Sequence, residues 1–142
     1  MVDVGDKEVT ERRAVAEATV VMAPATTALL VAGDLPKGDA FAVARIAAIQ
    51  GAKRTPDLVP LCHPLPVDAI DVEVDAVDEG VRIRVSVGVR ARTGVEMEAM
   101  TGAAVGAVAL YDMIKGVDRG AQISSVRLLH KSGGRSGTWN RD

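Results

Sequence analysis

Residues 70–90 read IDVEVDAVDEGVRIRVSVGVR, and this stretch decides the fold. Apolar residues alternate with charged ones on both sides of a turn at residues 78–80, which is the period-two pattern of two half-buried strands. If Val74 lies opposite Ile83, the acidic residues 73 and 75 fall opposite the arginines 84 and 82. One register therefore satisfies both the apolar and the charged faces, and the stretch is predicted to be a β-hairpin.

The segment on the N-terminal side begins with a strand and a short helix. Apolar residues at the even positions of residues 13–22 predict the strand. Pro24 suits the first turn of a helix over residues 25–31, and Gly33 ends that helix.

A second helix and a loop connect this region to the hairpin. Asp39 is placed to cap a helix whose apolar residues lie between positions 41 and 49. Four prolines between residues 56 and 66 break the chain after it, so we expect a loop that carries the sequence LCHPL at residues 61–65.

A long helix follows the hairpin. It is predicted over residues 95–117 and ends near Gly120. Residues 99–111 are apolar or small all the way round, so we expect burial on all sides. Gly102 and Gly106 would allow another backbone to approach closely.

A strand is predicted at residues 122–131, and a glycine-rich tail follows at residues 132–142. The sequence does not decide whether this tail is flexible. Strand, helices, strand, strand, helix, strand is the order of a ferredoxin-like α+β fold, here with an extra helix. The sequence thus predicts one domain, residues 1–142, with a four-stranded antiparallel sheet packed on helices. So small a sheet under an apolar helix also predicts a homo-oligomer.

Composition excludes several functions. Aromatic residues are 2% of the chain and the formal net charge is −2, which gives neither the stacking platforms nor the general attraction that nucleic acids need. We find no 18-residue apolar run and no signal-peptide pattern, so no membrane association is expected. A single cysteine, Cys62, suits a reduced compartment, and a cytoplasmic location is expected.

Charged residues outside the hairpin gather in short segments that suggest acid–base chemistry on a phosphorylated ligand. One cysteine and two histidines make no zinc set, and the tail does not have the order of a phosphate-binding P-loop. Structural explanations stay open: Asp39 as a simple helix cap, His63 as a structural residue, Glu96 and Glu98 as first-turn carboxylates, and the tail as a free end.

Several of these segments together resemble the MoaC family of cyclic pyranopterin monophosphate synthases, from Met1 to about Gly137. They are MVDV (1–4), KGDAF (37–41), residues 42–53, LCHPL (61–65), TGVEMEA (93–99), YDM (111–113) and KSGG (131–134). The resemblance implies conversion of 3′,8-cyclised 7,8-dihydroguanosine 5′-triphosphate to cyclic pyranopterin monophosphate with release of pyrophosphate, in molybdenum cofactor biosynthesis. It also implies a hexamer, a trimer of dimers with sites at the dimer interface. We expect no required metal cofactor, although Mg²⁺ could accompany the triphosphate or pyrophosphate.

Site residues follow from the resemblance position by position. It implies catalytic roles for Asp112, Lys115, Lys37 and His63, and substrate binding by Glu96, Glu98 and Lys131. The remaining residues of the predicted substrate-binding set are Met97, Cys62, Lys53, Arg54 and Arg135. Asp112 is the best general acid or base, and Lys115, three residues later, shares its helix face. Lys131, with Arg135, Lys53 and Arg54, would bind phosphate oxygens.

Two of these carboxylates raise a geometric question. Glu98 and Asp112 are 14 residues apart, which is about 21 Å along one helix. A single substrate cannot contact both, so we expect each site to combine Glu96 or Glu98 of one subunit with Asp112 and Lys115 of its neighbour. The alternatives are an oligomer that binds a pterin or nucleotide triphosphate without transforming it, and a purely structural assembly protein.

Overall fold

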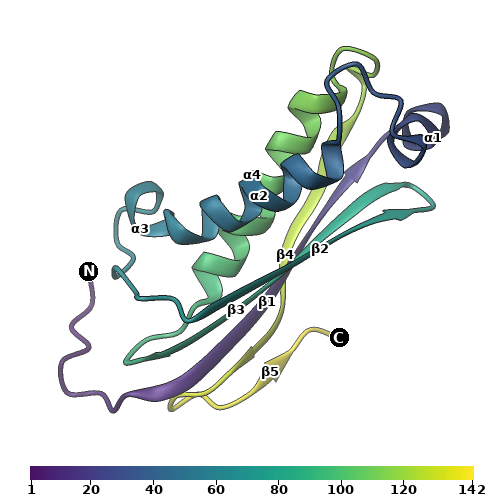
Figure 1. Ribbon diagram of the computed structural model, residues 1–142. Helices are drawn as coiled ribbons and strands as arrows, with labels where there is room; N and C mark the ends of the chain where they lie inside the picture. The colour runs from purple at the N-terminus through teal and green to yellow at the C-terminus, as the bar shows by residue number, and fades with distance from the viewer.

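Five antiparallel strands and four helices make up the computed structural model, which describes residues 1–142 (Figure 1). The elements are β1 (Thr10–Val21), α1 (Pro24–Ala32), α2 (Ala40–Lys53), α3 (Thr55–Leu58), β2 (Ala69–Val77), β3 (Gly80–Ala91), α4 (Glu96–Ile114), β4 (Gln122–Ser132) and β5 (Trp139–Asn140). The strands form one sheet in the order β2-β3-β1-β4-β5. α2 and α4 cover one face of this sheet, with α1 and α3 at opposite ends of the molecule (Figure 1). The chain therefore has an α+β architecture.

The β2–β3 hairpin has the predicted register. Val74 pairs with Ile83, and the acidic residues of β2 lie opposite the arginines of β3. Ile83 has no exposed surface, so the apolar side of the hairpin faces the core. Gly80 closes the turn with a φ of 149°, and a Cβ at this position would lie 2.1 Å from the carbonyl oxygen of Val20. The hairpin prediction is confirmed, and its turn requires glycine.

β1 runs through the middle of the sheet, antiparallel to both β3 and β4. Its even-numbered residues from 14 to 20 are fully buried under the helices. On the other face, Glu17 is only 5% exposed and accepts hydrogen bonds from Arg84 and Arg127. Burial opposes the ionisation of Glu17, but the hydrogen bonds from Arg127 and Arg84 outweigh it and lower its pKa. The charged face of the hairpin is thus organised around a buried carboxylate.

The sheet has five strands, so the prediction of four is wrong by one edge strand. β5 consists of two residues that pair with His130 and Lys131 of β4. It lies in the segment for which the sequence predicts only a glycine-rich tail. Two residues are too few to show any alternation, and the strand exists because β4 offers an open edge.

α2 and α4 pack through small residues, as predicted. A Cβ at Gly102 would lie 3.0 Å from the carbonyl oxygen of Ala48, and one at Gly106 would lie 3.2 Å from that of Ala44. The two helices are antiparallel, since the higher-numbered glycine meets the lower-numbered alanine. The C-terminal end of α4 consequently lies beside the N-terminal end of α2.

α4 is not buried on all sides within one chain, which corrects the prediction. Val108 is 59% exposed and Met97 is 41% exposed. These residues lie on the side of the helix that faces away from the sheet and from α2. An apolar helix face left uncovered in one chain is typical of a surface that associates.

The remaining helix boundaries follow local sequence signals. α1 begins at Pro24 and ends before Gly33, which has a φ of 75°. The Asp39 side chain accepts a hydrogen bond from the Ala42 backbone N–H at 2.9 Å and caps α2, as predicted. The four-residue helix α3 was not predicted, and it occupies the start of the proline-containing loop.

α4 is long and apolar enough to cross a membrane, contrary to the expectation that no segment qualifies. Half of the qualifying 18-residue window is buried inside the protein. Length and composition alone are weak indicators in such a case, because the core helix of a folded domain has the same properties.

Candidate active site

Three charged side chains meet at the C-terminal end of α4. The Lys37 ammonium donates to Asp112 Oδ2 at 2.8 Å and to the Asp112 carbonyl oxygen at 2.7 Å. Lys115 Nζ lies 2.6 Å from Asp112 Oδ1, so each carboxylate oxygen has its own ammonium partner. Lys37 reaches this position from the loop between α1 and α2. We call these three residues the Asp112 cluster.

The two lysines fix the ionisation state of the cluster. The hydrogen bond from Lys115, and then that from Lys37, lower the pKa of Asp112 to about 2. The same contact with Asp112 raises the pKa of Lys115. At neutral pH the cluster therefore holds an ionised carboxylate between two ammonium groups, with about half of each side chain open to solvent.

A pocket of about 190 Å³ lies at the opposite, N-terminal end of α4. Its lining residues are Cys62, His63, Leu65, Thr93, Gly94, Glu96, Met97 and Glu98, and we call it the Cys62–Glu98 pocket. The proline-containing loop supplies one wall, and the turn into α4 supplies the other. A Cβ at Gly94 would lie 1.9 Å from Glu96 Oε2, so only glycine lets this carboxylate fold over the turn.

Glu98 is the buried carboxylate of this pocket. Glu98 is 3% exposed, and this burial raises its pKa. The negative charge of Glu96 makes a smaller contribution in the same direction. Burial also raises the pKa of Cys62, and the nearby Glu98 adds to that increase. The pocket thus favours the protonated forms of both groups.

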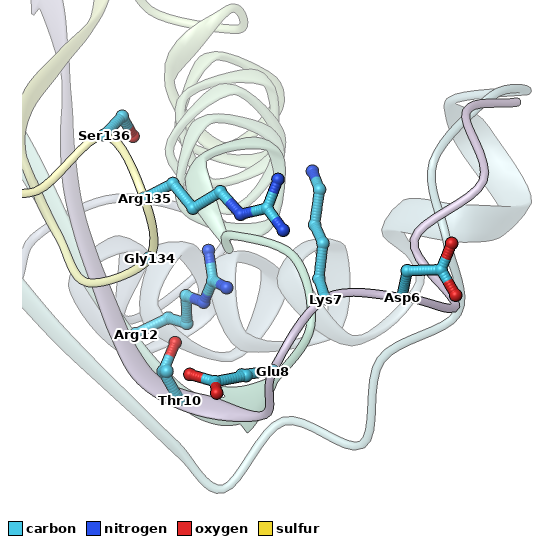
Figure 2. Close-up of a pocket in the computed structure, with 8 residues that line it drawn as sticks. All are labelled: Asp6, Lys7, Glu8, Thr10, Arg12, Gly134, Arg135 and Ser136. Carbon is cyan, nitrogen blue, oxygen red and sulfur yellow. The ribbon is translucent and has the colours of Figure 1, made fainter.

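A wider cavity of about 590 Å³, lined by no hydrophobic residue, lies near the same end of the molecule (Figure 2). It is lined by Asp6, Lys7, Glu8, Thr10, Arg12, Gly134, Arg135 and Ser136, and we call it the Lys7–Arg135 cavity. Figure 2 shows the side chains of Lys7, Arg12 and Arg135 approaching it from the N-terminal segment, β1 and the tail. Arg12 Nη2 donates to the Arg92 carbonyl oxygen at 3.1 Å, which links the cavity to the turn before α4. Two cations near the start of the sequence, Lys7 and Arg12, and one from the tail, Arg135, converge here.

Lys131 contacts a residue that lines this cavity. It lies on β4 opposite Ala14 of β1, and its ammonium group donates to the hydroxyl of Ser136, which lines the cavity. The tail is further tied to the sheet by Arg141, whose Nε donates to the Leu128 carbonyl oxygen. Lys131 and Arg135 are therefore held in one region.

The MoaC family model matches residues 1–134. The chain belongs to the MoaC family. It is similar to the cyclic pyranopterin monophosphate synthases of Streptomyces coelicolor (52% identical over 141 residues, 99% of this chain and 83% of that protein), Dinoroseobacter shibae (51% over 144 residues, 100% and 91%) and Roseiflexus castenholzii (55% over 139 residues, 96% and 88%). These alignments span essentially the whole chain.

Within this MoaC-family chain, the predicted site residues fall into two groups at opposite ends of α4. Lys37, Asp112 and Lys115 are at the C-terminal end. The other predicted residues lie towards the N-terminal end. They are Cys62, His63, Glu96, Met97 and Glu98 in the pocket, Arg135 in the cavity, Lys131 hydrogen-bonded to Ser136 of the cavity, and exposed Lys53 and Arg54 where α2 ends. The structure does not bring the two groups together within one chain.

Lys7 and Arg12 are candidate site residues that sequence reasoning missed. Their neighbour in space is the tail, because β1 pairs with β4 and places Arg13 opposite Ser132. No local pattern reports such a pairing, and the only signal was the pair of arginines at the start of the first strand. Thr10 Oγ1 and Arg12 Nε are buried without a hydrogen-bond partner in the chain, so both keep a free hydrogen-bonding group at this cavity.

Proposed function

We propose that this chain is a cyclic pyranopterin monophosphate synthase of molybdenum cofactor biosynthesis. Its substrate is then 3′,8-cyclised 7,8-dihydroguanosine 5′-triphosphate. The observation that carries the proposal is the match to synthases over nearly the full chain, together with the paired Asp112 and Lys115 inside the matched region. Ring rearrangement produces the pyranopterin, and a sugar hydroxyl attacks the α-phosphate. A new P–O bond forms while the bond to the β-phosphate breaks, so pyrophosphate leaves.

The Asp112 cluster supplies the acid–base groups. A carboxylate with a pKa of about 2 is a weak base on its own at neutral pH, because proton transfer is most efficient when the pKa is near the working pH. Its stronger role is to hold Lys115 and Lys37 as oriented ammonium groups. Substrate that displaces one lysine would raise the basicity of Asp112 and leave the other lysine as proton donor.

The Lys7–Arg135 cavity is the proposed triphosphate site. Guanidinium groups bind phosphate oxygens through charge-assisted and often bidentate hydrogen bonds. Arg12 is already fixed by its hydrogen bond to the Arg92 carbonyl oxygen, so little of its side-chain freedom remains to be lost on binding. Lys131 supports the same site through Ser136. Lys53 and Arg54 are exposed cations that would attract the triphosphate.

The Cys62–Glu98 pocket is the proposed site for the guanine-derived ring. His63 and the two carboxylates offer donors and acceptors that match the edges of such a ring, while Met97 and Cys62 offer apolar surface. A protonated Glu98 is also a candidate proton donor. His63 therefore either orients the ring or takes part in proton transfer.

Two copies of the chain are proposed to complete one site. Met97, Thr101, Ala104, Val108 and Asp112 follow at helical spacing along the uncovered face of α4. The midpoint between residues 97 and 112 falls between Ala104 and Val105, where the small side chain of Ala104 permits close packing. A two-fold axis at that point would place Met97 of one copy opposite Asp112 of the other, and thus join the two groups of site residues.

The larger assembly proposed is a hexamer, a trimer of such dimers, built from a ferredoxin-like α+β fold. The arrangement of β2, β3, β1 and β4 around α2 and α4 supports the fold, with β5 as an addition. We propose a cytoplasmic location, for which the single Cys62 is the supporting observation.

No resident metal is part of the proposal. No three ligating side chains among His, Cys, Asp and Glu come together in the chain. Mg²⁺ would instead enter with the triphosphate or leave with pyrophosphate.

Pyrophosphate release from the cyclised guanosine triphosphate tests the function. The wild-type protein should release pyrophosphate together with a pterin product, and Asp112→Asn should lose kcat by about 10²- to 10⁴-fold. Asp68→Asn is the matched control, since this carboxylate accepts the Arg90 backbone N–H at 2.8 Å far from the Asp112 cluster. Tight binding without any pyrophosphate from the wild type would instead favour a non-catalytic binding module.

A further inference from the structure

Asp118 lies in the turn after α4 and reaches across to the start of α1. Its Oδ2 accepts hydrogen bonds from the Ala23 backbone N–H at 3.0 Å and from the Thr26 hydroxyl at 3.1 Å. Ala23 occupies the N-cap position of α1 and has no side chain that could cap the helix. Asp118 supplies this cap from 95 positions away in the sequence.

The other oxygen of Asp118 holds its own turn. Oδ1 accepts a hydrogen bond from the Gly120 backbone N–H at 3.0 Å. The Tyr111 hydroxyl donates to the Arg119 carbonyl oxygen at 3.2 Å and ties the same turn to the last turns of α4. Lys115 is the C-cap residue of α4, so its backbone position depends on how this turn is closed.

The second lysine of the Asp112 cluster is reached through α1. Gly33 caps the C-terminal end of this helix, and Lys37 follows four residues later. Leu30 and Leu35 are buried and anchor the segment, while residues 31–34 between them are exposed. The start of α1 is fixed by Asp118, and the loop beyond its end presents Lys37 to Asp112.

We infer that Asp118 is a positioning residue that sets the placement of both Lys37 and Lys115 around Asp112. One carboxylate fixes the turn that follows Lys115 and the helix that leads to Lys37. The two ammonium groups therefore approach opposite oxygens of Asp112 from two elements that share one anchor. The catalytic consequence rests on the proposed function, whereas the geometric consequence does not.

Titration of the Asp112 carboxyl group by carbon-13 NMR, without substrate, tests the geometry. In Asp118→Ala the lysines lose their common anchor, so the pKa of Asp112 should rise from about 2 towards its ordinary value of 3.8. Asp68→Ala is the matched control, because it removes another carboxylate that accepts a backbone N–H, at the other end of the chain's core. It should leave the Asp112 titration unchanged.

A second variant covers the case in which Asp118→Ala does not fold. Asp118→Asn keeps the size of the side chain and one acceptor oxygen for α1, but its amide group cannot accept from Gly120. We expect a smaller shift of the Asp112 pKa in the same direction. If both variants fold and the pKa of Asp112 is unchanged in both, the inference is overturned. If only Asp118→Asn folds, an unchanged pKa of Asp112 in that variant overturns it.

Kinetics separate positioning from a general loss of stability. Asp118→Ala should lower kcat about 10-fold, since small misplacements of reacting groups are costly. KM should change much less, because the proposed phosphate-binding residues lie near the other end of α4. If the wild type releases no pyrophosphate, the proposed function fails, and the NMR result still decides the role of Asp118.

Discussion

Asp112 and Glu98 are two carboxylates on the same helix, and their surroundings are opposite. Asp112 is exposed at the C-terminal end of α4 and is paired with two lysines, which lower its pKa to about 2. Glu98 is buried at the N-terminal end, and burial raises its pKa. The lysine partners of Asp112 and the burial of Glu98 therefore decide which carboxylate is ionised more readily.

The difference assigns different chemistry to the two ends. Where the surroundings push the pKa values of two titratable groups apart, the groups are suited to different acid and base roles. The C-terminal end offers fixed ammonium donors around an anion, and the N-terminal end offers a carboxyl group that keeps its proton more readily. A site that combines both ends would hold both kinds of group, which neither end has alone.

The largest effect is expected at the C-terminal end. Lys115→Met removes the cation that contributes most to the low pKa of Asp112. We expect kcat for pyrophosphate release to fall by about 10²- to 10⁴-fold, because a proton donor is lost. The pKa of Asp112 should rise, and Lys37→Met should raise it less. Equal shifts in the two variants would contradict the ranking of the two lysines.

A smaller effect of a different kind is expected in the Lys7–Arg135 cavity. Arg12→Ala should raise KM by about 10- to 100-fold, the magnitude of a lost charge-assisted hydrogen bond, with a weaker effect on kcat. Steady-state kinetics of pyrophosphate release would measure this. Arg45→Ala is the control, since Arg45 donates to the Val72 carbonyl oxygen at 3.3 Å and lies outside the site. A fall in kcat at unchanged KM would remove Arg12 from the binding role.

The smallest effect concerns stability. Because burial raises the pKa of Glu98, the folded chain keeps a proton that the unfolded chain releases above the ordinary value of 4.5. Stability should therefore decrease as the pH rises from 4.5 through the raised pKa. Glu98→Gln has no proton to release at this position, so its stability should not show the part of the decrease that Glu98 causes. The variant should therefore be more stable than wild type at pH 7. Thermal unfolding between pH 4 and pH 8 compares them, and parallel curves would contradict the assignment.

The hairpin could be predicted from sequence because two independent patterns, apolar and charged, agree on one register. Val74 opposite Ile83 is a consequence of local order and needs no knowledge of the rest of the chain. The close approach of α2 to α4 at Gly102 could also be predicted from local sequence, since an apolar helix with small residues must pack tightly. β5 was not predictable, because a two-residue strand exists only through the edge it joins.

The site was predictable only in part. Spacing along α4 places Asp112 and Lys115 on one helix face. The contact of Lys37 with Asp112 instead depends on the antiparallel packing of α2 against α4, which no local pattern predicts. The roles of His63 and Lys131 came from family resemblance rather than from any pattern. Arg12 was missed because its partners in the tail become neighbours only when β1 pairs with β4.

The most direct test of the central claim, that the two ends of α4 make one site between two copies, is activity of a mixed oligomer. Glu98→Ala and Asp112→Ala chains carrying different tags would be co-expressed, and pyrophosphate release would be compared with that of each variant alone. In a two-fold dimer formed at random, about a quarter of the sites contain both intact residues, so activity should recover to about that fraction. Mixed oligomers that remain as inactive as the separate variants would contradict the shared site.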